Sequence, residues 1–461
     1  MTLWWNEQDR ILDVLSLIPQ FGNLLWTIVA FVIALSVIVA VHEYGHYIVG
    51  RWSGIHAEVF SIGFGPVLWS RVDKRGTRWQ IALLPFGGYV KFLGDANAAS
   101  GKDEKAIEGI ATQSPEELRR TMHGAPLWAR AATVAAGPVF NFVMSILVFG
   151  LIFWSQGVSK EPLTVGSLQP LPGTVQELRE GDVITAIAGV PTPDYDEEGA
   201  WQDFIEALPV EPVLDYTVIR DGETLDVQAP WMFPPLIRQV APRSAAMDIQ
   251  LKQGDVITAV NEEPIFAFEQ LKDFVEGSDG RVLLLDVWRD GSELEFALAP
   301  RRTDEPQPDG GFVTHWRIGI IGGMMLEPAT EPAGILDSLT GGVRQTGRII
   351  EGSLSGIWHM VTGAISTCNI SGPIGIAETS GAMASQGAQN FIFFIAVLST
   401  AVGLLNLFPI PALDGGHLVF YAYEAIAGKP PSDGALRVLM GVGITLILTL
   451  MLFSVSNDLF C

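Results

Sequence analysis

Residues His42, Glu43, Tyr44, Gly45 and His46 form an H-E-x-x-H pattern. On a helix, residues four positions apart lie on one face, so the two imidazoles would point the same way with the Glu43 carboxylate beside them. Two histidines and a neighbouring glutamate can hold zinc and activate a water molecule for hydrolysis. The pattern therefore predicts a hydrolytic metal centre, and a chance match is the alternative.

The five residues lie near the end of an apolar run that starts at about residue 23 and carries no charge before His42. A helix over 23–50, roughly 28 residues, would reach about 42 Å and could cross a bilayer with some tilt. Ionisable side chains are costly inside a membrane, which makes them candidates for a functional site. The alternative is that these polar residues only end a membrane span.

Composition agrees with a membrane protein that carries soluble insertions, since 48% of residues are hydrophobic and only 17% are charged. Further apolar runs predict spans at 131–157, 390–415 and 435–457, which gives about four spans in all. Residues 1–22 are a lead-in without the marks of a cleaved signal, so the first run should stay as an anchor. A net charge of −23 argues against nucleic acid as a partner.

The segment 51–130 contains eleven Lys or Arg and eight Asp or Glu. The positive-inside rule places this loop in the cytoplasm and the N-terminus outside, and four spans return the C-terminus outside. Within the loop, Glu58–Ser70 and Arg78–Phe92 have the composition of β-strands. They could form a small β-domain with its own core or a hairpin that enters the membrane, and periodicity does not distinguish the two.

A second block, residues 158–333, contains 12 Lys or Arg and 32 Asp or Glu, a net charge of −20. The hexapeptide GDVITA occurs in it twice, at 181–186 and 254–259, and each copy is followed by a helical stretch and a strand pair. The repeat predicts two similar α+β domains at 158–230 and 231–330. Apolar residues at helical spacing in 331–385 then predict an amphipathic segment, lying on the membrane or packed on the second domain.

A catalytic zinc ion usually takes three protein ligands, so a third must join His42 and His46. The third span ends in N-x-x-P-x-P-x-L-D-G, from Asn406 to Gly415. Asp414 would lie there at the same cytoplasmic depth as the two histidines. The turn alone fits Asp414 equally well as a helix cap.

Together, the two motifs resemble the site-2 protease family of intramembrane zinc proteases. The segment Ile62-Gly63-Phe64-Gly65-Pro66 and the GPVFN stretch at 137–141 are also similar to that family. Within GPVFN, the interruptions Gly137, Pro138 and Asn141 would pack helices closely or take part in the chemistry. The two GDVITA domains resemble bacterial PDZ modules, and the layout is similar to the RseP-type bacterial subgroup, which degrades membrane-anchored anti-sigma factors.

The resemblance implies a polytopic α-helical membrane protein with a cytoplasmic or re-entrant β-region and two inserted α+β PDZ-like domains. It implies zinc as the cofactor, held by His42, His46 and Asp414. Glu43 would be the general base for a zinc-bound water that attacks the peptide carbonyl, and then the acid that protonates the leaving amine.

Substrate-binding roles also follow from the resemblance. Asn406 would donate its amide to the substrate backbone or oxyanion, or equally would satisfy helix carbonyls freed by nearby prolines. The strand Gly63, Phe64 and Gly65 would pair with an unwound substrate, because a helix must become extended before its peptide bonds can be cut.

The implied activity is cleavage of the transmembrane segment of single-span proteins such as a trimmed anti-sigma factor. The PDZ-like domains would act as a size filter and could bind peptide ligands. The implied place is the bacterial inner membrane, with these domains in the periplasm and the active site near the cytoplasm. Alternatives are a general remover of remnant signal peptides and a catalytically silent scaffold that presents PDZ domains; the complete set of His42, Glu43, His46 and Asp414 opposes the scaffold.

Overall fold

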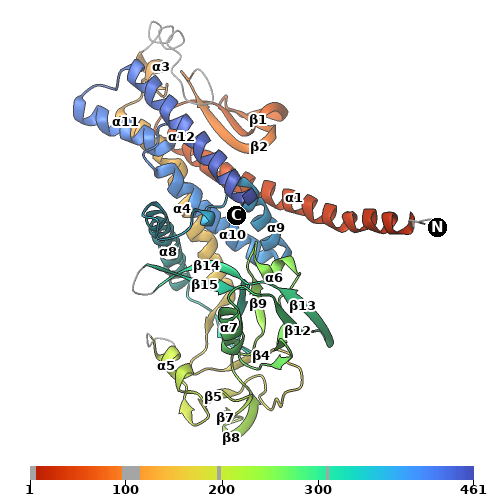
Figure 1. Ribbon diagram of the computed structural model, residues 1–461. Helices are drawn as coiled ribbons and strands as arrows, with labels where there is room; N and C mark the ends of the chain where they lie inside the picture. The colour runs from red at the N-terminus through yellow and green to blue at the C-terminus, as the bar shows by residue number, and fades with distance from the viewer. Residues whose placement is uncertain (1–6, 96–114, 195–198, 308–310, 461) are drawn as a thin grey trace, which may run out of the picture. The chain divides into compact units, whose positions relative to one another are not determined.

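The computed structural model describes residues 7–95, 115–194, 199–307 and 311–460 (Figure 1). The chain divides into two compact units. The helical unit comprises Met1–Leu151, Leu339–Trp358 and Thr367–Cys461, and the β-rich unit comprises Ile152–Ser338 and His359–Ser366. The H-E-x-x-H residues belong to the helical unit, and both GDVITA copies belong to the β-rich unit.

Four helices in the described part of the chain are long and apolar enough to cross a membrane. They are the Leu24–Trp52 portion of α1 (Glu7–Trp52), α4 (Leu127–Gln156), α10 (Ala388–Leu407) and α12 (Asp433–Phe460). The prediction of a polytopic α-helical membrane protein with about four spans is confirmed. Outside the two GDVITA copies, the other described helices are α3 (Pro115–Arg119), α8 (Ile335–Val361), the short η1 (Thr367–Asn369), α9 (Pro373–Ser385) and α11 (Asp414–Ala427).

Small residues and hydroxyls hold the helices of this unit together. A Cβ on Gly45 of α1 would lie 2.5 Å from the carbonyl oxygen of Ala136 in α4, so the two backbones meet at this glycine. Ser399 of α10 donates a hydrogen bond of 3.0 Å to the carbonyl of Asn141, and Ser145 of α4 donates one of 2.8 Å to Ala396. These contacts fix α1, α4 and α10 against one another.

The β-region is one long hairpin of β1 (Ala57–Val72) and β2 (Arg78–Phe92), which lies beside α1 (Figure 1). Both strands bend, so that Val59–Ile62 pairs with Gly88–Lys91 on one edge and with Arg78–Ile81 on the other, and Val67–Val72 pairs with Arg78–Ala82. The inner part of the hairpin, Ala57–Ile62 with Gly88–Phe92, shares a core with Tyr47 of α1. Its outer part is different, because large apolar side chains there are exposed: Val67, Leu68, Trp69, Leu83 and Leu84. The hairpin therefore has a packed inner part and an uncovered apolar outer part.

Helix α11 is attached to the start of α4 by an ion pair. Arg130 donates two hydrogen bonds to Glu424, at 3.0 and 2.6 Å, and its guanidinium lies 5.2 Å from the ring centre of Tyr421. Arg130 also donates to the carbonyl of Ala125 at 3.1 Å. Since α11 begins at Asp414, this contact helps to fix the helix that carries the candidate third ligand.

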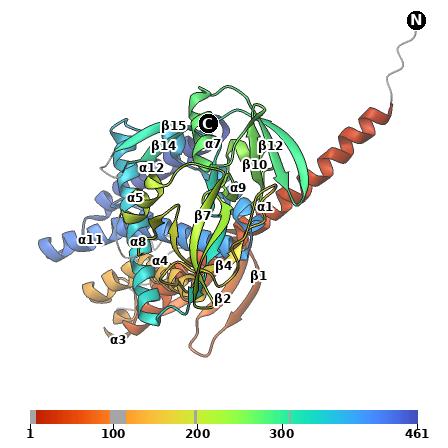
Figure 2. The ribbon, with the colours of Figure 1, turned by 90° about the horizontal axis from the view of Figure 1, so that it is seen from below.

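The β-rich unit contains two four-stranded sheets with matching orders, β6-β5-β7-β8 and β11-β10-β12-β13, and Figure 2 shows β7 and β12 in separate sheets. The two GDVITA copies supply equivalent strands, β5 and β10. The elements of the first copy are β4 (Val165–Leu168), β5 (Val183–Ile187), β6 (Val190–Pro191), α5 (Ala200–Ala207), β7 (Val213–Arg220) and β8 (Glu223–Pro230). Those of the second are β9 (Ile237–Val240), α6 (Ala245–Asp248), β10 (Val256–Val260), β11 (Glu263–Pro264), α7 (Phe268–Gly277), β12 (Leu283–Arg289) and β13 (Ser292–Leu298).

After the second copy, the chain adds short strands that pair with strands of both copies. A hairpin of β14 (Arg301–Pro306) and β15 (Phe312–Arg317) comes first. Then β16 (Ile320–Gly322) pairs with β9, β17 (Leu326–Pro328) pairs with β4, and β18 (Thr330–Glu331) pairs with β3 (Val158–Ser159). The returning strands therefore tie both copies and both ends of the inserted block together.

The aspartate of each GDVITA copy is buried and binds an arginine at the tip of the closing hairpin. Arg220 donates two hydrogen bonds of 2.7 Å to Asp182, and Arg289 donates two of 2.6 Å to Asp255. Burial alone would raise the pKa of Asp182, but the hydrogen bonds and positive charges of Arg220 and Arg179 together outweigh it and hold that pKa below its usual range. The repeated Asp thus has a structural role in each copy.

We expect Asp182→Asn to destabilise the β-rich unit by about 2–3 kcal/mol, because the partly buried Arg220 would lose its charged partner. In the wild type, the lowered pKa means that this stabilisation is present above about pH 4 and is lost as pH falls through the pKa of folded Asp182. Thermal unfolding of the purified chain between pH 3 and 7 measures both effects.

Asp248→Asn is the matched control, since Asp248 and its partner Arg301 are both about half exposed. We expect it to change stability by less than about 0.5 kcal/mol. Equal losses in the two variants would contradict a special role for Asp182.

Candidate active site

Three potential metal ligands converge where α1 meets α11. The Nε2 atoms of His42 and His46 lie 3.1 Å apart, and Asp414 Oδ2 lies 3.2 Å from the first and 3.4 Å from the second. Among the described residues, this is the one group of three His, Cys, Asp or Glu whose ligand atoms all lie within 4.8 Å of one another. The structure therefore brings together the three residues that sequence proposed as ligands, and His417 is not a member of the group.

The spacing of these atoms fits a tetrahedral zinc ion. Zinc binds histidine nitrogen and carboxylate oxygen at about 2.0–2.2 Å, which sets ligand atoms about 3.3–3.5 Å apart in a tetrahedron. Asp414 Oδ2 is buried without a hydrogen-bond donor, although a buried carboxylate oxygen normally has one. A cation bound between the three side chains would satisfy this oxygen.

Contacts of the outer ring nitrogens orient both histidines. His46 Nδ1 lies 2.9 Å from the carbonyl oxygen of Thr133 in α4, so it donates its proton there and leaves Nε2 free for a metal. His42 Nδ1 lies 3.2 Å from the side-chain amide of Asn141, whose Oδ1 is buried without a partner. Rotating that amide by 180° would let His42 Nδ1 donate to Oδ1, which satisfies both groups.

Gly137 of α4 provides the space that the histidines occupy. A Cβ at this position would overlap the His46 ring at Nε2 and would lie 2.8 Å from His42 Cε1. No other residue type fits here, because every other side chain begins with a Cβ. The glycine of the GPVFN stretch thus contacts the site directly, while it also packs helices.

Asp414 reaches the site through a tight turn between α10 and α11. Ala412 has a left-handed backbone with φ of 88°, which is rare outside glycine. Gly415 and Gly416 lie directly against the carbonyls of the preceding turn, where a Cβ would overlap Leu407 and Ile410. The Asp-Gly-Gly sequence therefore lets α11 start close to α10 and directs Asp414 at the histidines.

Glu43 faces the inner part of the hairpin. A Cβ on Gly88 of β2 would lie 3.0 Å from Glu43 Cγ and 2.7 Å from the carbonyl oxygen of Ser61 in β1. Gly88 therefore allows the hairpin backbone to lie against the glutamate of the H-E-x-x-H pattern. The arrangement places an acid–base group between the ligand set and a β-strand.

The residues proposed for substrate binding have other contacts in the structure. Asn406 donates its side-chain amide to the carbonyl of Val402, one turn earlier in α10, at 3.0 Å. Gly63 and Gly65 have left-handed φ values of 90° and 84°, so this part of β1 is not a regular extended strand. Phe64 stacks on Tyr89 of β2, with ring centres 5.9 Å apart. Their roles toward a substrate remain predictions.

The sequence indicated no role for Thr133. For Gly137 and Asn141 it left two roles open, close packing of helices and direct participation in the chemistry. The interruption of an apolar span by Gly and Asn was the available signal for the last two. Thr133 gave none, because its backbone carbonyl makes the contact and any residue could supply a carbonyl.

Converging, partly buried histidines and a carboxylate beside a glutamate, with the histidines on a helix that can span a membrane, are the groups expected of an intramembrane metallopeptidase site. Comparison with known proteins agrees: residues 30–450 match the model of peptidase family M50. The chain belongs to this family of site-2 proteases, so the family and enzyme class expected from the motifs are confirmed.

Individual relatives match almost the whole chain. A protein of Agrobacterium fabrum named as a candidate zinc metalloprotease is 36% identical over 448 residues, which is 96% of this chain and 98% of the relative. The regulator of sigma-E protease RseP of Salmonella typhimurium is 32% identical over 469 residues, covering 95% of this chain and 99% of the relative. Such relatives support an integral protein of the inner membrane.

We expect Gly137→Ala to lower the amount of metal bound to the purified chain at least tenfold, because the added methyl group would displace the His46 ring from the ligand set. Metal analysis by mass spectrometry measures the change. Gly441→Ala is the control, since a Cβ at Gly441 of α12 would meet open space and should leave the metal content unaltered. Full metal occupancy in the Gly137 variant would contradict the assigned geometry.

Proposed function

We propose that this chain is an intramembrane zinc endopeptidase that cleaves the transmembrane segment of single-span proteins. The observation that carries the proposal is the convergence of His42, His46 and Asp414 next to Glu43, with the two histidines on a span-length helix. The donor set of two imidazoles and one carboxylate is that of known zinc peptidases, and the names of the relatives also support zinc.

Each residue of the site has a part in hydrolysis. Zinc, when bound, activates water and polarises the scissile carbonyl. Glu43 accepts a proton from the attacking water and then donates it to the leaving amine. Thr133 and Asn141 keep the His42 and His46 rings in the orientation that leaves Nε2 of each ring as the ligand.

The inner hairpin offers a place for an unwound substrate. The Val59–Ile62 part of β1 is paired on both edges, so we place the substrate along the Gly88–Phe92 part of β2. A peptide there would pass beside Glu43, since a Cβ on Gly88 would lie 3.0 Å from Glu43 Cγ. We also assign hydrogen bonds with the substrate to the backbone of the Gly63–Gly65 segment. Because Gly63 and Gly65 are left-handed and interrupt the regular strand, these bonds would form at separate points and not as a continuous ladder. Asn406 would have to release Val402 before its amide could bind the substrate.

The exposed outer part of the hairpin favours the membrane-inserted alternative over a separate β-domain. Five large apolar side chains of this outer part are uncovered in the described structure, and an aqueous loop would not leave them exposed. Lipid would cover Leu68, Trp69 and Leu83. We therefore propose that the β1–β2 hairpin enters the bilayer from the cytoplasmic side, next to the active site.

We further propose that the two sheets of the β-rich unit are PDZ-like domains in the periplasm that exclude substrates with large outer domains. The strongly acidic block and the basic loop 51–130 support opposite sides of the membrane. A trimmed anti-sigma factor is the substrate class that the similarity to RseP suggests. Removal of remnant signal peptides is the alternative within the same chemistry.

Glu43→Gln should retain zinc but lower cleavage of a single-span substrate in detergent by at least about a hundredfold, because the amide cannot accept a proton. Fragment masses and zinc content, measured on the same preparation, separate loss of acid–base catalysis from loss of metal. Cleavage at the wild-type rate would refute the role of Glu43, and a wild-type chain without any turnover would favour the silent scaffold.

Removing most of the β-rich block tests whether it acts as the proposed size filter. Because β3 and β18 pair through Ser159 and Thr330, residues 162–327 can be replaced by a short Gly-Ser linker while this pair is kept. We expect the shortened chain to cut trimmed and untrimmed substrates at similar rates, whereas the full chain prefers the trimmed one. An unchanged preference would show that selection lies elsewhere.

A further inference from the structure

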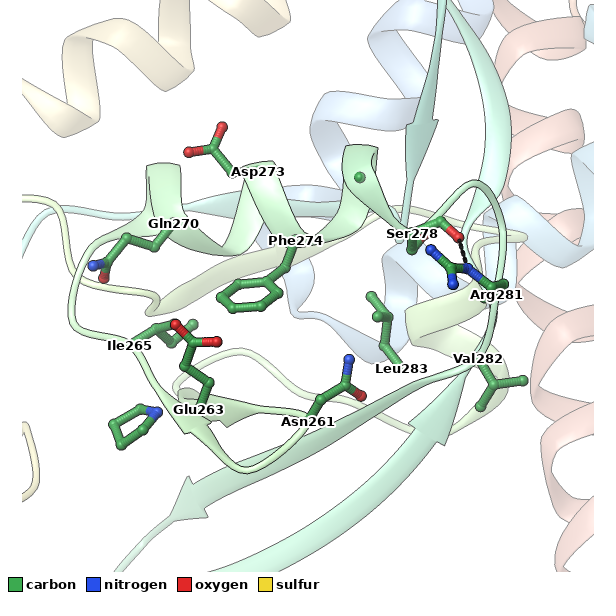
Figure 3. Close-up of a pocket in the computed structure, with 12 residues that line it drawn as sticks. Asn261, Glu263, Ile265, Gln270, Asp273, Phe274, Ser278, Arg281, Val282 and Leu283 are labelled. Atoms are coloured by element: carbon green, nitrogen blue, oxygen red, sulfur yellow. Dashed lines mark hydrogen bonds between the residues drawn. The ribbon is translucent and has the colours of Figure 1, made fainter.

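The second copy of the β-rich unit contains a cavity that the proposed proteolysis does not use. Its volume is about 580 Å³, and it lies between α7, the turn that follows β10, and the start of β12 (Figure 3). Residues 261–283 supply the whole wall, so the cavity is a property of this one copy. Pockets of this size commonly hold small ligands or the side chains of a bound peptide.

The interior of the cavity is apolar. Ile265 and Leu283 form buried parts of the wall, and the partly buried ring of Phe274 on α7 lies between them (Figure 3). Pro264 and Val282 line the mouth, where Val282 is 62% exposed. This surface would gain from contact with an aliphatic or aromatic side chain.

The rim is charged, and its charges are separated. Glu263 and Asp273 lie toward one end and Arg281 toward the other (Figure 3). In the described structure, neither carboxylate has a hydrogen bond or ion pair. Arg281 is held at its end because Nε donates to the carbonyl of Ser278 at 2.9 Å. The acidic end is therefore available for a basic group.

A hydrogen-bond donor also faces the cavity. Asn261 Oδ1 accepts a bond of 3.0 Å from the backbone N–H of Leu284, which leaves the side-chain NH₂ directed into the cavity (Figure 3). This amide could donate to a peptide carbonyl at the mouth.

The first copy lacks these polar groups at the matching positions. With the offset of 73 residues between the GDVITA copies, Asn261 corresponds to Ala188 and Glu263 to Val190. The turn itself is shared, since Ala188 and Asn261 have left-handed φ values of 49° and 51°. A left-handed turn therefore does not by itself account for the amide and the carboxylate of the second copy.

We propose that this cavity, the α7 pocket, binds an extended segment of a partner protein that presents an aliphatic or aromatic side chain beside a lysine or arginine. The apolar side chain fills the space at Phe274, and the basic group pairs with Glu263 and Asp273. The net charge of −20 on residues 158–333 attracts such a basic segment and repels an acidic one. This mode inserts a side chain and differs from addition of a strand to a sheet edge. Binding needs neither metal nor cleavage, so it is independent of the proposed protease chemistry.

The test uses the full chain with Glu43→Gln, so that no peptide is cut, in neutral detergent at low salt. Dye-labelled eight-residue peptides of Gly and Ser carry Leu-Lys, Leu-Glu or Ala-Lys at the centre, and fluorescence anisotropy gives each Kd. We expect Leu-Lys to bind about three- to tenfold more tightly than either other peptide.

Two sets of variants locate the binding. Glu263→Gln with Asp273→Asn should abolish the preference for Leu-Lys over Leu-Glu, and Val282→Trp should weaken both leucine peptides by filling the mouth. Glu262→Gln with Asp279→Asn is the matched control, because it removes two exposed charges from the same copy outside the pocket and should leave the preference unchanged. Thermal unfolding of each variant checks its fold.

Equal binding of the Leu-Lys and Leu-Glu peptides to the parent chain would overturn the proposal. So would an equal loss of preference in the control pair, since the effect would then come from the overall negative charge. Either result leaves the proposed zinc chemistry untouched, and loss of peptide cleavage in other assays leaves this binding untouched.

Discussion

The mutual proximity of two imidazole nitrogens and one carboxylate oxygen is the constraint on which the helical unit depends. His46 donates a hydrogen bond from Nδ1–H to the carbonyl of Thr133, so a neutral ring presents a lone pair at Nε2 toward the buried oxygen of Asp414. Three electron-rich atoms within 3.4 Å repel one another in a low-dielectric interior unless a cation or a proton lies between them. A bound divalent metal would therefore join α1 and α11 as well as provide chemistry.

The rest of the helical unit is built to permit this approach. Gly137 gives the histidine rings their space, Gly88 brings the hairpin against Glu43, and the Asp-Gly-Gly turn starts α11 beside the end of α10. In each case the absence of a side chain allows a catalytic group to sit against backbone. The ion pair of Arg130 with Glu424 then holds the far end of α11, so that Asp414 is fixed from both directions.

Local patterns in the sequence were sufficient for some of these features and insufficient for others. The helix face shared by His42 and His46 follows from their spacing, and apolar run length is enough to predict four spans. The choice of Asp414 needed the combination of two motifs. Contacts made through backbone, such as the Thr133 carbonyl, leave no trace in residue type. The strand pairs β16–β9 and β17–β4 join segments that are far apart in the sequence, so no local hydrophobic pattern predicts them. The α7 pocket depends on which side chains meet after folding, and a local pattern does not predict it either.

We infer that one zinc ion is bound by His42, His46 and Asp414. X-ray absorption at the zinc edge of the purified chain, combined with metal stoichiometry, tests it most directly. We expect one zinc per chain, with two imidazole groups and oxygen ligands at about 2.0–2.2 Å, and loss of this signal in Asp414→Ala. A zinc site with sulfur at about 2.3 Å, or an unaltered spectrum and stoichiometry in Asp414→Ala, would contradict it.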